Sequence, residues 1–164
     1  MPDMLVRLYD MPEIFDESRL LRHKVTIKQA LALDKSIILE FVRRNFTDGW
    51  VSECERAVNN DPVSCYIAVK DNTIIGFACY DATAKGFFGP IGVAEAARGK
   101  SVGEALLWRC LHSMKEKGYA YAIIGWVTDA IAFYEKTVGA EVIEGSSAEK
   151  SIYSNLISLG SSGL

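Results

Sequence analysis

The sequence has few of the residues that build metal centres or bind nucleic acid. Its two histidines, His23 and His112, lie far apart and near no group of cysteines or carboxylates, so we expect no metal site. Lys and Arg number 18 against 21 Asp and Glu, for a net charge of −3. This chain lacks the basic excess that nucleic acid or an anionic membrane surface requires of its partners. We therefore expect it to bind neither.

The four cysteines are also few, and their spacing carries no motif. Cys54, Cys65, Cys79 and Cys110 match neither a metal cluster nor a CxxC redox pair. Cys65 and Cys79 lie in strand-like runs, and Cys110 lies on the apolar face of a predicted helix. We interpret all four as buried free thiols in a reducing compartment, which predicts a cytoplasmic protein.

Long hydrophobic runs and internal repeats are absent as well. No apolar stretch has the length of a membrane span, and charged residues interrupt the first 25 positions too often for a signal peptide. The 164 residues, 49% of them hydrophobic and 24% charged, suffice for one domain with a substantial core. We expect a single domain over residues 1–164, with 1–23 as an N-terminal arm or strand and 147–164 as a C-terminal strand and loose tail.

Hydrophobic periodicity predicts a mixed order of strands and helices. The run at 85–93 is irregular because it contains Gly89, Pro90 and Gly92, a pattern typical of a bulge or of a backbone that a ligand approaches closely. The order predicts a mixed α/β layer fold around one sheet. The expected elements are a strand from 25, helices at 33–46 and 50–59, a hairpin of 63–69 with 73–80, the run at 85–93, a helix from 102 to about 117, a strand at 119–127, a helix at 131–137 and a strand at 140–143.

The loop before the helix at 102 is the most informative stretch. Arg98-Gly99-Lys100-Ser101 leads directly into the helix, so free backbone N–H groups and the positive end of a helix dipole meet at one point. Such a point suits a phosphate. The helix itself carries an apolar stripe of Val102, Leu106, Leu107, Cys110, Leu111 and Met114.

One interpretation of this loop is a nucleotide-binding P-loop. Residues 94–101 nearly match G-x-x-x-x-G-K-[ST], with Ala94 in place of the first glycine. Residues 122–129 resemble a hydrophobic strand that ends in a magnesium-binding aspartate, Asp129. Against an NTPase or kinase, only two predicted strands follow Ser101 before the tail, and the preceding hairpin favours antiparallel neighbours.

A second interpretation begins the motif at Arg98. The stretch Arg98-Gly99-Lys100-Ser101-Val102-Gly103 resembles the pyrophosphate loop [QR]-x-x-G-x-[GA] of the GNAT superfamily of N-acetyltransferases. Residues 130–140, with Phe133-Tyr134-Glu135-Lys136 inside them, resemble the second signature of that family. Two motifs in this order are more specific than either alone. The resemblance covers about residues 24–143 and implies an α/β (α+β) fold with a mixed, mostly antiparallel central sheet flanked by helices.

The resemblance implies direct acetyl transfer from acetyl-CoA to a primary amine of a small molecule, without a metal. Tyr134 would be the general acid for the departing thiolate, and a backbone N–H, that of Val93, would stabilise the acetyl oxygen. Two positions depart from the family pattern: Ser101 stands where the first loop glycine is usual, and Val127 where many relatives carry asparagine. The implied cofactor-binding residues are Ile91, Val93, Arg98, Gly99, Lys100, Ser101, Val102 and Gly103.

The acceptor side is less defined by the sequence. Trp50, Tyr80, Phe88 and Trp126 are the candidate substrate-binding residues. The general base stays open among Glu53, Asp81, Glu95, Asp129 and a water held by backbone carbonyls. Dimerisation, common in the family, would cover sheet edges. A non-catalytic CoA-binding sensor with the same fold is a further alternative.

Overall fold

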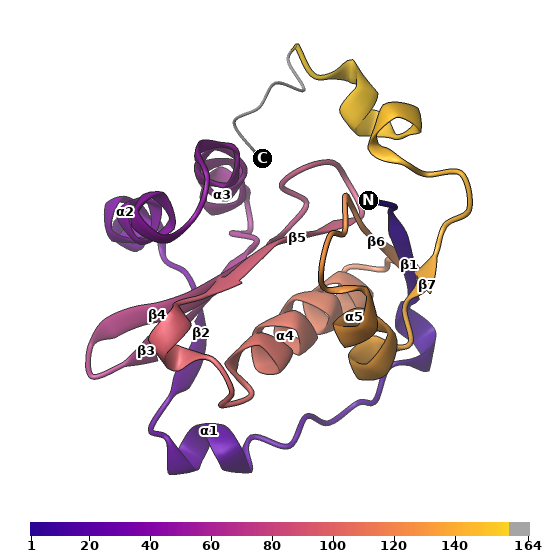
Figure 1. Ribbon diagram of the computed structural model, residues 1–164. Helices are drawn as coiled ribbons and strands as arrows, with labels where there is room; N and C mark the ends of the chain where they lie inside the picture. Colours follow the sequence, from indigo (N-terminus) through magenta and orange to yellow (C-terminus); the bar gives the residue numbers. More distant parts are fainter. Residues whose placement is uncertain (158–164) are drawn as a thin grey trace.

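A computed structural model describes residues 1–157, which fold around one seven-stranded sheet (Figure 1). Across the sheet the strands follow the order β2-β3-β4-β5-β6-β1-β7. Within the described residues only the pair β5–β6 is parallel. The predicted mixed, mostly antiparallel sheet is therefore confirmed. The strands are β1 (Met4–Arg7), β2 (Thr26–Gln29), β3 (Cys65–Lys70), β4 (Thr73–Tyr80), β5 (Phe87–Val93), β6 (Tyr121–Ile124) and β7 (Glu141–Val142).

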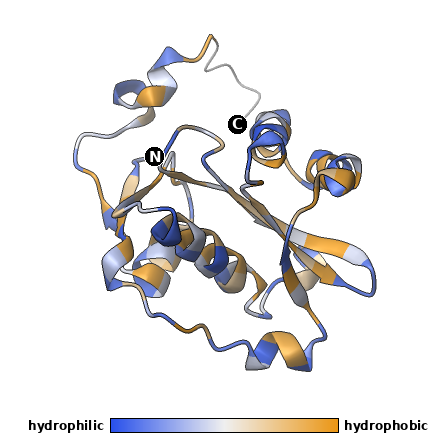
Figure 2. Cartoon of the chain, turned by 180° about the vertical axis from the view of Figure 1, so that it is seen from behind, coloured by the Kyte–Doolittle hydropathy of each residue, from blue (hydrophilic) through white to orange (hydrophobic). Residues whose placement is uncertain are grey.

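Helices cover both faces of the sheet. In Figure 1, α2 and α3 lie on one face, and α4 and α5 lie on the other. The short α1 connects β1 to β2 along the outside. Orange and blue segments alternate around α2 and α3 in Figure 2, as expected for helices with one face on the core. The helices are α1 (Ser18–Arg22), α2 (Lys35–Asn45), α3 (Asp48–Asn59), α4 (Val102–Glu116) and α5 (Ile131–Val138).

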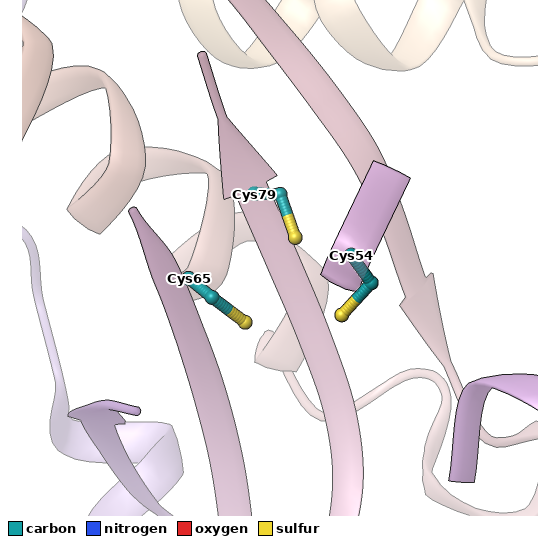
Figure 3. Close-up of side chains that lie close together, drawn as sticks. All are labelled: Cys54, Cys65 and Cys79. Carbon is teal, nitrogen blue, oxygen red and sulfur yellow. The ribbon is translucent and has the colours of Figure 1, made fainter. Parts of the chain in front are cut away.

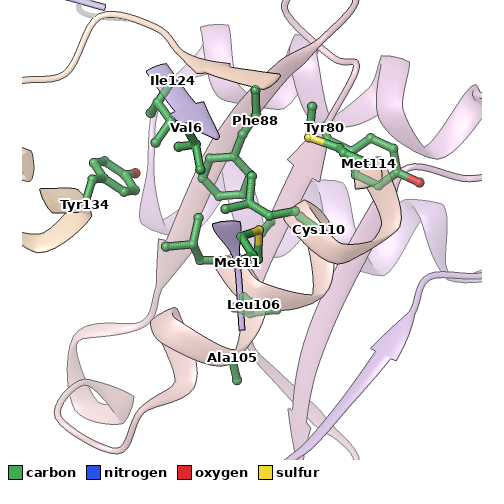
Figure 4. Close-up of a cluster of buried hydrophobic side chains, with 14 of the residues drawn as sticks. Val6, Met11, Tyr80, Phe88, Ala105, Leu106, Cys110, Met114, Ile124 and Tyr134 are labelled. Carbon is green, nitrogen blue, oxygen red and sulfur yellow. The ribbon is translucent and has the colours of Figure 1, made fainter. Parts of the chain in front are cut away.

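The pleat of the central strands divides the apolar residues into two cores. Along β4, Phe77 and Cys79 belong to the cluster beneath α2 and α3, whereas Ala78 and Tyr80 belong to the cluster beneath α4. Figure 4 shows part of the second cluster. The apolar stripe predicted for the helix at 102 is fully buried there, which confirms the helix and its orientation: Val102, Leu106, Leu107, Cys110, Leu111 and Met114.

Local sequence signals explain several element boundaries. The β3–β4 hairpin turns at Asp71 and Asn72, both with positive φ, as a two-residue turn between twisted strands requires. The hydroxyl of Thr47 caps α3 by accepting from the N–H of Trp50. Gly139, with φ of 63°, ends α5 as predicted.

The C-terminal region differs from the prediction. Within the described part of the C-terminal strand expected at 147–164, the chain instead forms two 3-10 helices, Ala148–Lys150 and Ile152–Asn155. The Ser154 hydroxyl donates to the Ser151 carbonyl, a local bond that favours a turn over strand pairing, and the Ser151 hydroxyl donates to the Asp3 carboxylate. The expected loose tail at 159–164 lies outside the described residues.

The N-terminal segment is a strand inside the sheet. β1 lies between β6 and β7 and pairs antiparallel with both. In residues 1–157, no helix combines the length and the apolar composition that a transmembrane span needs.

Candidate active site

A cavity of about 670 Å³ opens where β5 and β6 separate. The two strands pair only at Phe87–Ile123 and Phe88–Ile124. Then β6 ends, while β5 continues to Val93 along β4. Residues after the pairing point on both strands line the cavity, together with the N-terminal turn of α4 and residues of α3 and α5. The parting strands therefore leave a gap in the sheet with exposed backbone groups.

The register of β5 shows which backbone groups face this gap. Ala94 N–H donates to the Ile75 carbonyl at 2.8 Å, which fixes the phase of the antiparallel ladder with β4. Since bonded and non-bonded pairs alternate, Gly92 bonds to β4, whereas Ile91 and Val93 direct their backbone groups to the opposite side. The carbonyl of Val93 accepts from Nε of Arg98 at 3.3 Å. The Val93 N–H and both backbone groups of Ile91 thus face the gap.

The loop before α4 directs the helix N-terminus into the same cavity. Gly99 has φ of 79°, and Ser101, the N-cap of α4, has φ of 61° and ψ of 15°. Serine therefore occupies a left-handed conformation that glycine adopts at less cost. The first intrahelical bond runs from Ala105 N–H to the Ser101 carbonyl. The N–H groups from Ser101 to Glu104 consequently lack intrahelical acceptors.

The loop is anchored and carries positive charge. Arg19 of α1 donates to the Gly99 carbonyl at 2.8 Å, and both Arg19 and Arg98 line the cavity. Lys100 does not line it. Arginines beside a helix N-terminus make this end suitable for a phosphate group.

A P-loop does not fit this geometry. In a P-loop protein the strand before the loop lies in a parallel sheet, whereas β5 has antiparallel β4 along most of its length. The NTPase or kinase interpretation is therefore wrong, and the motif is the one that begins at Arg98.

Tyr134 lies at the inner edge of the cavity. Its side chain is 6% exposed and packs edge-on against Phe88, with ring centroids 6.3 Å apart. Figure 4 shows it beside Ile124, the last residue of β6. Burial raises the pKa of Tyr134 above its ordinary value. The phenol thus keeps its proton at neutral pH, as a general acid must.

Aromatic rings form the far end of the cavity. Phe46 packs on Trp50 at 5.1 Å between ring centroids, and Trp126 meets Tyr153 edge-on at 5.0 Å. Two glycines make room for these rings. A Cβ on Gly92 would lie 2.4 Å from the Phe46 ring, and one on Gly125 would lie 2.0 Å from the Tyr153 hydroxyl. The rings at this end are Phe46, Trp50, Trp126 and Tyr153, whereas Phe88, which also lines the cavity, packs on Tyr134 in the core beneath α4.

One carboxylate lies among these rings. Glu53, on α3, lines the cavity and accepts a hydrogen bond from the hydroxyl of Thr83 at 2.5 Å. Burial raises the pKa of Glu53, against the opposing effect of the Thr83 hydrogen bond. Thr83 belongs to the connection between β4 and β5. The carboxylate is thereby fixed between α3 and the loop after β4.

The N-terminus holds the aromatic end together. Asp3 is 6% exposed, and its carboxylate accepts from the backbone N–H of Trp126 at 2.9 Å and from the hydroxyl of Ser151. Trp126 has φ of 50°, a conformation that this bond stabilises. Asp3 thus joins β6 to the segment that carries Tyr153.

Most of the predicted site residues line the cavity, but some do not. Trp50, Phe88 and Trp126 line the cavity, but Tyr80 does not. The Tyr80 prediction is wrong because the pleat of β4 turns its ring toward α4, where Lys117 lies 5.2 Å from its centroid. The predicted cofactor residues that line the cavity are Ile91, Val93, Arg98, Gly99, Ser101, Val102 and Gly103.

The candidate bases separate as well. Glu53 lines the cavity, whereas Asp81, Glu95 and Asp129 do not. Asp81 is buried and accepts from the Gly86 N–H, Lys117 and Tyr119, so its carboxylate closes the β4–β5 loop. The sequence interpretation missed Phe46, Thr83 and Tyr153. Phe46 could have been identified from the sequence, because Phe46 and Trp50 form an aromatic pair around the start of a predicted helix.

Three cysteines lie close together, as Figure 3 shows, in the core against which Phe46 and Trp50 pack. The sulfur atoms of Cys54, Cys65 and Cys79 lie within 4.8 Å of one another, and all three side chains are fully buried. Cys65 and Cys79 are opposite each other on β3 and β4, and Cys54 approaches from α3. Linear spacing did not predict this cluster, because sheet pairing creates it.

The predicted free thiols are confirmed, and Cys110 is a fourth. Within residues 1–157 the three clustered cysteines are the one group whose donor atoms could meet at a metal ion. Three thiolates around a divalent ion would leave a net negative charge in an apolar core, which is costly. Their apolar surroundings suit small side chains that pack α3 onto the sheet.

Comparisons with known proteins agree with this architecture. The family model described as the acetyltransferase (GNAT) family matches residues 32–140. A GCN5-related N-acetyltransferase from Sphaerobacter thermophilus is similar in structure, with a TM-score of 0.63 and 23% identity over 87% of this chain and 48% of that chain. A search of curated proteins finds no match.

Two other similar structures are acetyltransferases named for their substrates. A glucosamine N-acetyltransferase region of a fungal multi-domain β-N-acetylglucosaminidase gives a TM-score of 0.70 at 18% identity, over 87% of this chain and 19% of that chain. An aminoglycoside acetyltransferase from an uncultured soil metagenomic sample gives 0.54 at 15% identity, over 72% and 89%. This chain spans less than half of the Sphaerobacter enzyme and of the fungal protein. Sequence identities below 25% show that the fold is shared and nothing more.

Proposed function

Because this chain belongs to the acetyltransferase (GNAT) family, we propose that it transfers the acetyl group of acetyl-CoA directly to a primary amine of a small molecule. The observation that carries the proposal is the cavity itself. It brings the helix N-terminus of α4, the unpaired backbone of β5 and the buried Tyr134 to one space. The glucosamine and aminoglycoside enzymes of similar fold support an amine as the acceptor.

The residues fit a CoA thioester at one end of the cavity. The N–H groups at the start of α4, with Arg98 beside them, would bind the pyrophosphate. The backbone N–H and carbonyl of Ile91, which have no strand partner in the gap, would bond to the amide-containing arm of CoA. The Val93 N–H would donate to the carbonyl oxygen of the thioester and stabilise the negative charge that develops there.

Tyr134 would supply the proton that the leaving thiolate needs. Its phenol lies inside the cavity and stays protonated because burial raises its pKa. The attacking amine must lose a proton, and Glu53 is the one candidate base from the sequence that lines the cavity. We place the amine between Glu53 and the separation of β5 and β6. The four free thiols support a reducing compartment such as the cytoplasm.

Ligand-dependent stability and CoA release test this proposal together. Acetyl-CoA should raise the melting temperature, whereas Mg-ATP should not, because a ligand that binds the folded state stabilises it. A panel of primary amines should then release free CoA and yield N-acetylated products. If CoA bound tightly but no amine in the panel were acetylated, the protein would be a CoA sensor and not a transferase. If Mg-ATP alone stabilised the protein, both the transferase and the sensor function would be refuted.

A further inference from the structure

We propose that the acceptor carries a single ammonium group next to an aromatic or other flat apolar group. Its ammonium binds Glu53, and its apolar part lies among the rings at the far end of the cavity. This inference rests on the proposed function and names the substrate class of the same site.

The aromatic end is suited to an apolar ligand. Four rings line it from four separate parts of the chain: Phe46 from the α2–α3 connection, Trp50 from α3, Trp126 from the segment after β6, and Tyr153 from the 3-10 helix Ile152–Asn155. Trp50, Phe46 and Trp126 line the cavity and are only half-buried. Aromatic faces favour flat apolar groups and also attract an ammonium group above the ring.

The charge at this end fits one ammonium group. Among the described residues that line the cavity, the acidic ones are Glu53 and Glu104. Glu104 belongs to the first turn of α4, at the CoA end, where Arg19 and Arg98 also lie. A polyamine or aminoglycoside would place its further ammonium groups against aromatic rings or arginines. Each would lose water without gaining a carboxylate partner, which opposes binding.

Glu53 is positioned for this contact before any ligand arrives. The Thr83 hydroxyl donates to Oε1, and a carboxylate has a second oxygen, Oε2, that can accept from another donor. An ammonium donor to a carboxylate gives a strong, charge-assisted hydrogen bond. Burial disfavours the isolated carboxylate and raises the pKa of Glu53, so an incoming cation would offset that cost.

The surrounding rings are fixed rather than adaptable. Asp3 holds the backbone of Trp126 and the hydroxyl of Ser151, and Tyr153 packs against both Gly125 and Trp126. Gly92 accommodates Phe46 in the same way on β5. A pocket built from fixed rings selects by shape, which favours a small flat amine over a large flexible polycation.

Binding and turnover with three amines test the inference. The probes are 2-phenylethylamine, spermidine and kanamycin, with 2-phenylethanol as the uncharged analogue of the first. We expect 2-phenylethylamine to give a kcat/KM at least 10-fold above the two polycations. By calorimetry it should bind at least 10-fold more tightly than 2-phenylethanol.

Two variants on α3 separate the Glu53 contact from other effects. Glu53→Gln should keep the Thr83 hydrogen bond and the affinity for CoA, yet remove the preference for the amine over the alcohol. Glu55→Gln is the matched control, because Glu55 is exposed and pairs with Lys35 at 2.9 Å. It should change neither quantity.

The outcomes distinguish this inference from the proposed function. Faster acetylation of spermidine or kanamycin than of 2-phenylethylamine would overturn the inference and leave acetyl transfer standing. Binding of 2-phenylethylamine that depends on Glu53, with no acetylation of any amine, would support the ligand class and refute the transfer. An amine preference that survives Glu53→Gln would overturn the assignment of Glu53.

Discussion

Replacing Gly103 by alanine should weaken CoA binding without lowering the stability of the fold. Gly103 is the second residue of α4, and a Cβ built there finds its nearest neighbour, Val93 Cγ2, at 3.8 Å. This is ordinary contact, so the methyl group fits the protein without strain. Alanine should also favour the helix by up to about 1 kcal/mol over glycine. The free energy of unfolding should therefore hold or rise.

CoA binding should respond in the opposite direction. The added methyl group would project where the pyrophosphate approaches the first N–H groups of α4 and would lengthen one charge-assisted hydrogen bond. Such bonds contribute about 1.5–3 kcal/mol, which corresponds to roughly 10- to 100-fold in Kd. Isothermal titration with CoA measures the Kd, and urea unfolding measures the stability.

A control at the other end of the same helix completes the test. Glu116→Ala, at the exposed last residue of α4, should leave the CoA affinity unchanged. If Gly103→Ala also left the Kd within 2-fold of wild type, the helix N-terminus would not be the pyrophosphate site.

Three further predictions concern the loop, the acid and the aromatic end. Tyr134→Phe should lower kcat about 100-fold and leave the KM for acetyl-CoA unchanged, as the loss of a general acid does. Because burial raises the pKa of Tyr134, turnover by the wild type should persist at alkaline pH until the phenol loses its proton. A pH–rate profile of the wild type and of Tyr134→Phe measures both effects. Ser101→Gly should raise the free energy of unfolding by about 1 kcal/mol in urea titrations, because it relieves the left-handed serine; an unchanged midpoint would contradict this. Gly125→Ala should displace Tyr153 and raise the KM for the amine, and this effect should largely vanish in a Tyr153→Ala background, whereas additive effects would refute the contact.

The sequence predicts the elements of this fold well because their signals are local. The apolar stripe of α4 and the Asp71-Asn72 turn depend on neighbours within a few residues, and both are as expected. The left-handed conformation of Ser101 also has a local signal, because Ser101 stands at a position where the family pattern has glycine. The expected C-terminal strand is wrong because side-chain bonds act in that segment: Ser154 bonds to the Ser151 carbonyl, and Ser151 bonds to the distant Asp3.

The acceptor end depends on contacts that linear reasoning does not reach. Tyr153 joins the site through Asp3, 148 positions from Ser151 along the chain. The cysteine cluster arises from pairing between β3 and β4. Tyr80 looked equivalent to Trp50 as an aromatic candidate, but the phase of the β4 pleat decides which face its ring takes. That phase is set by all the neighbouring strands together.

The most direct test of the central claim is the product formed from acetyl-CoA and 2-phenylethylamine. Mass spectrometry should detect N-acetyl-2-phenylethylamine in amounts that match the CoA thiol released, with little of either from Tyr134→Phe. Release of CoA without the acetylated amine, or no release with any primary amine, would contradict acetyl transfer at the gap between β5 and β6.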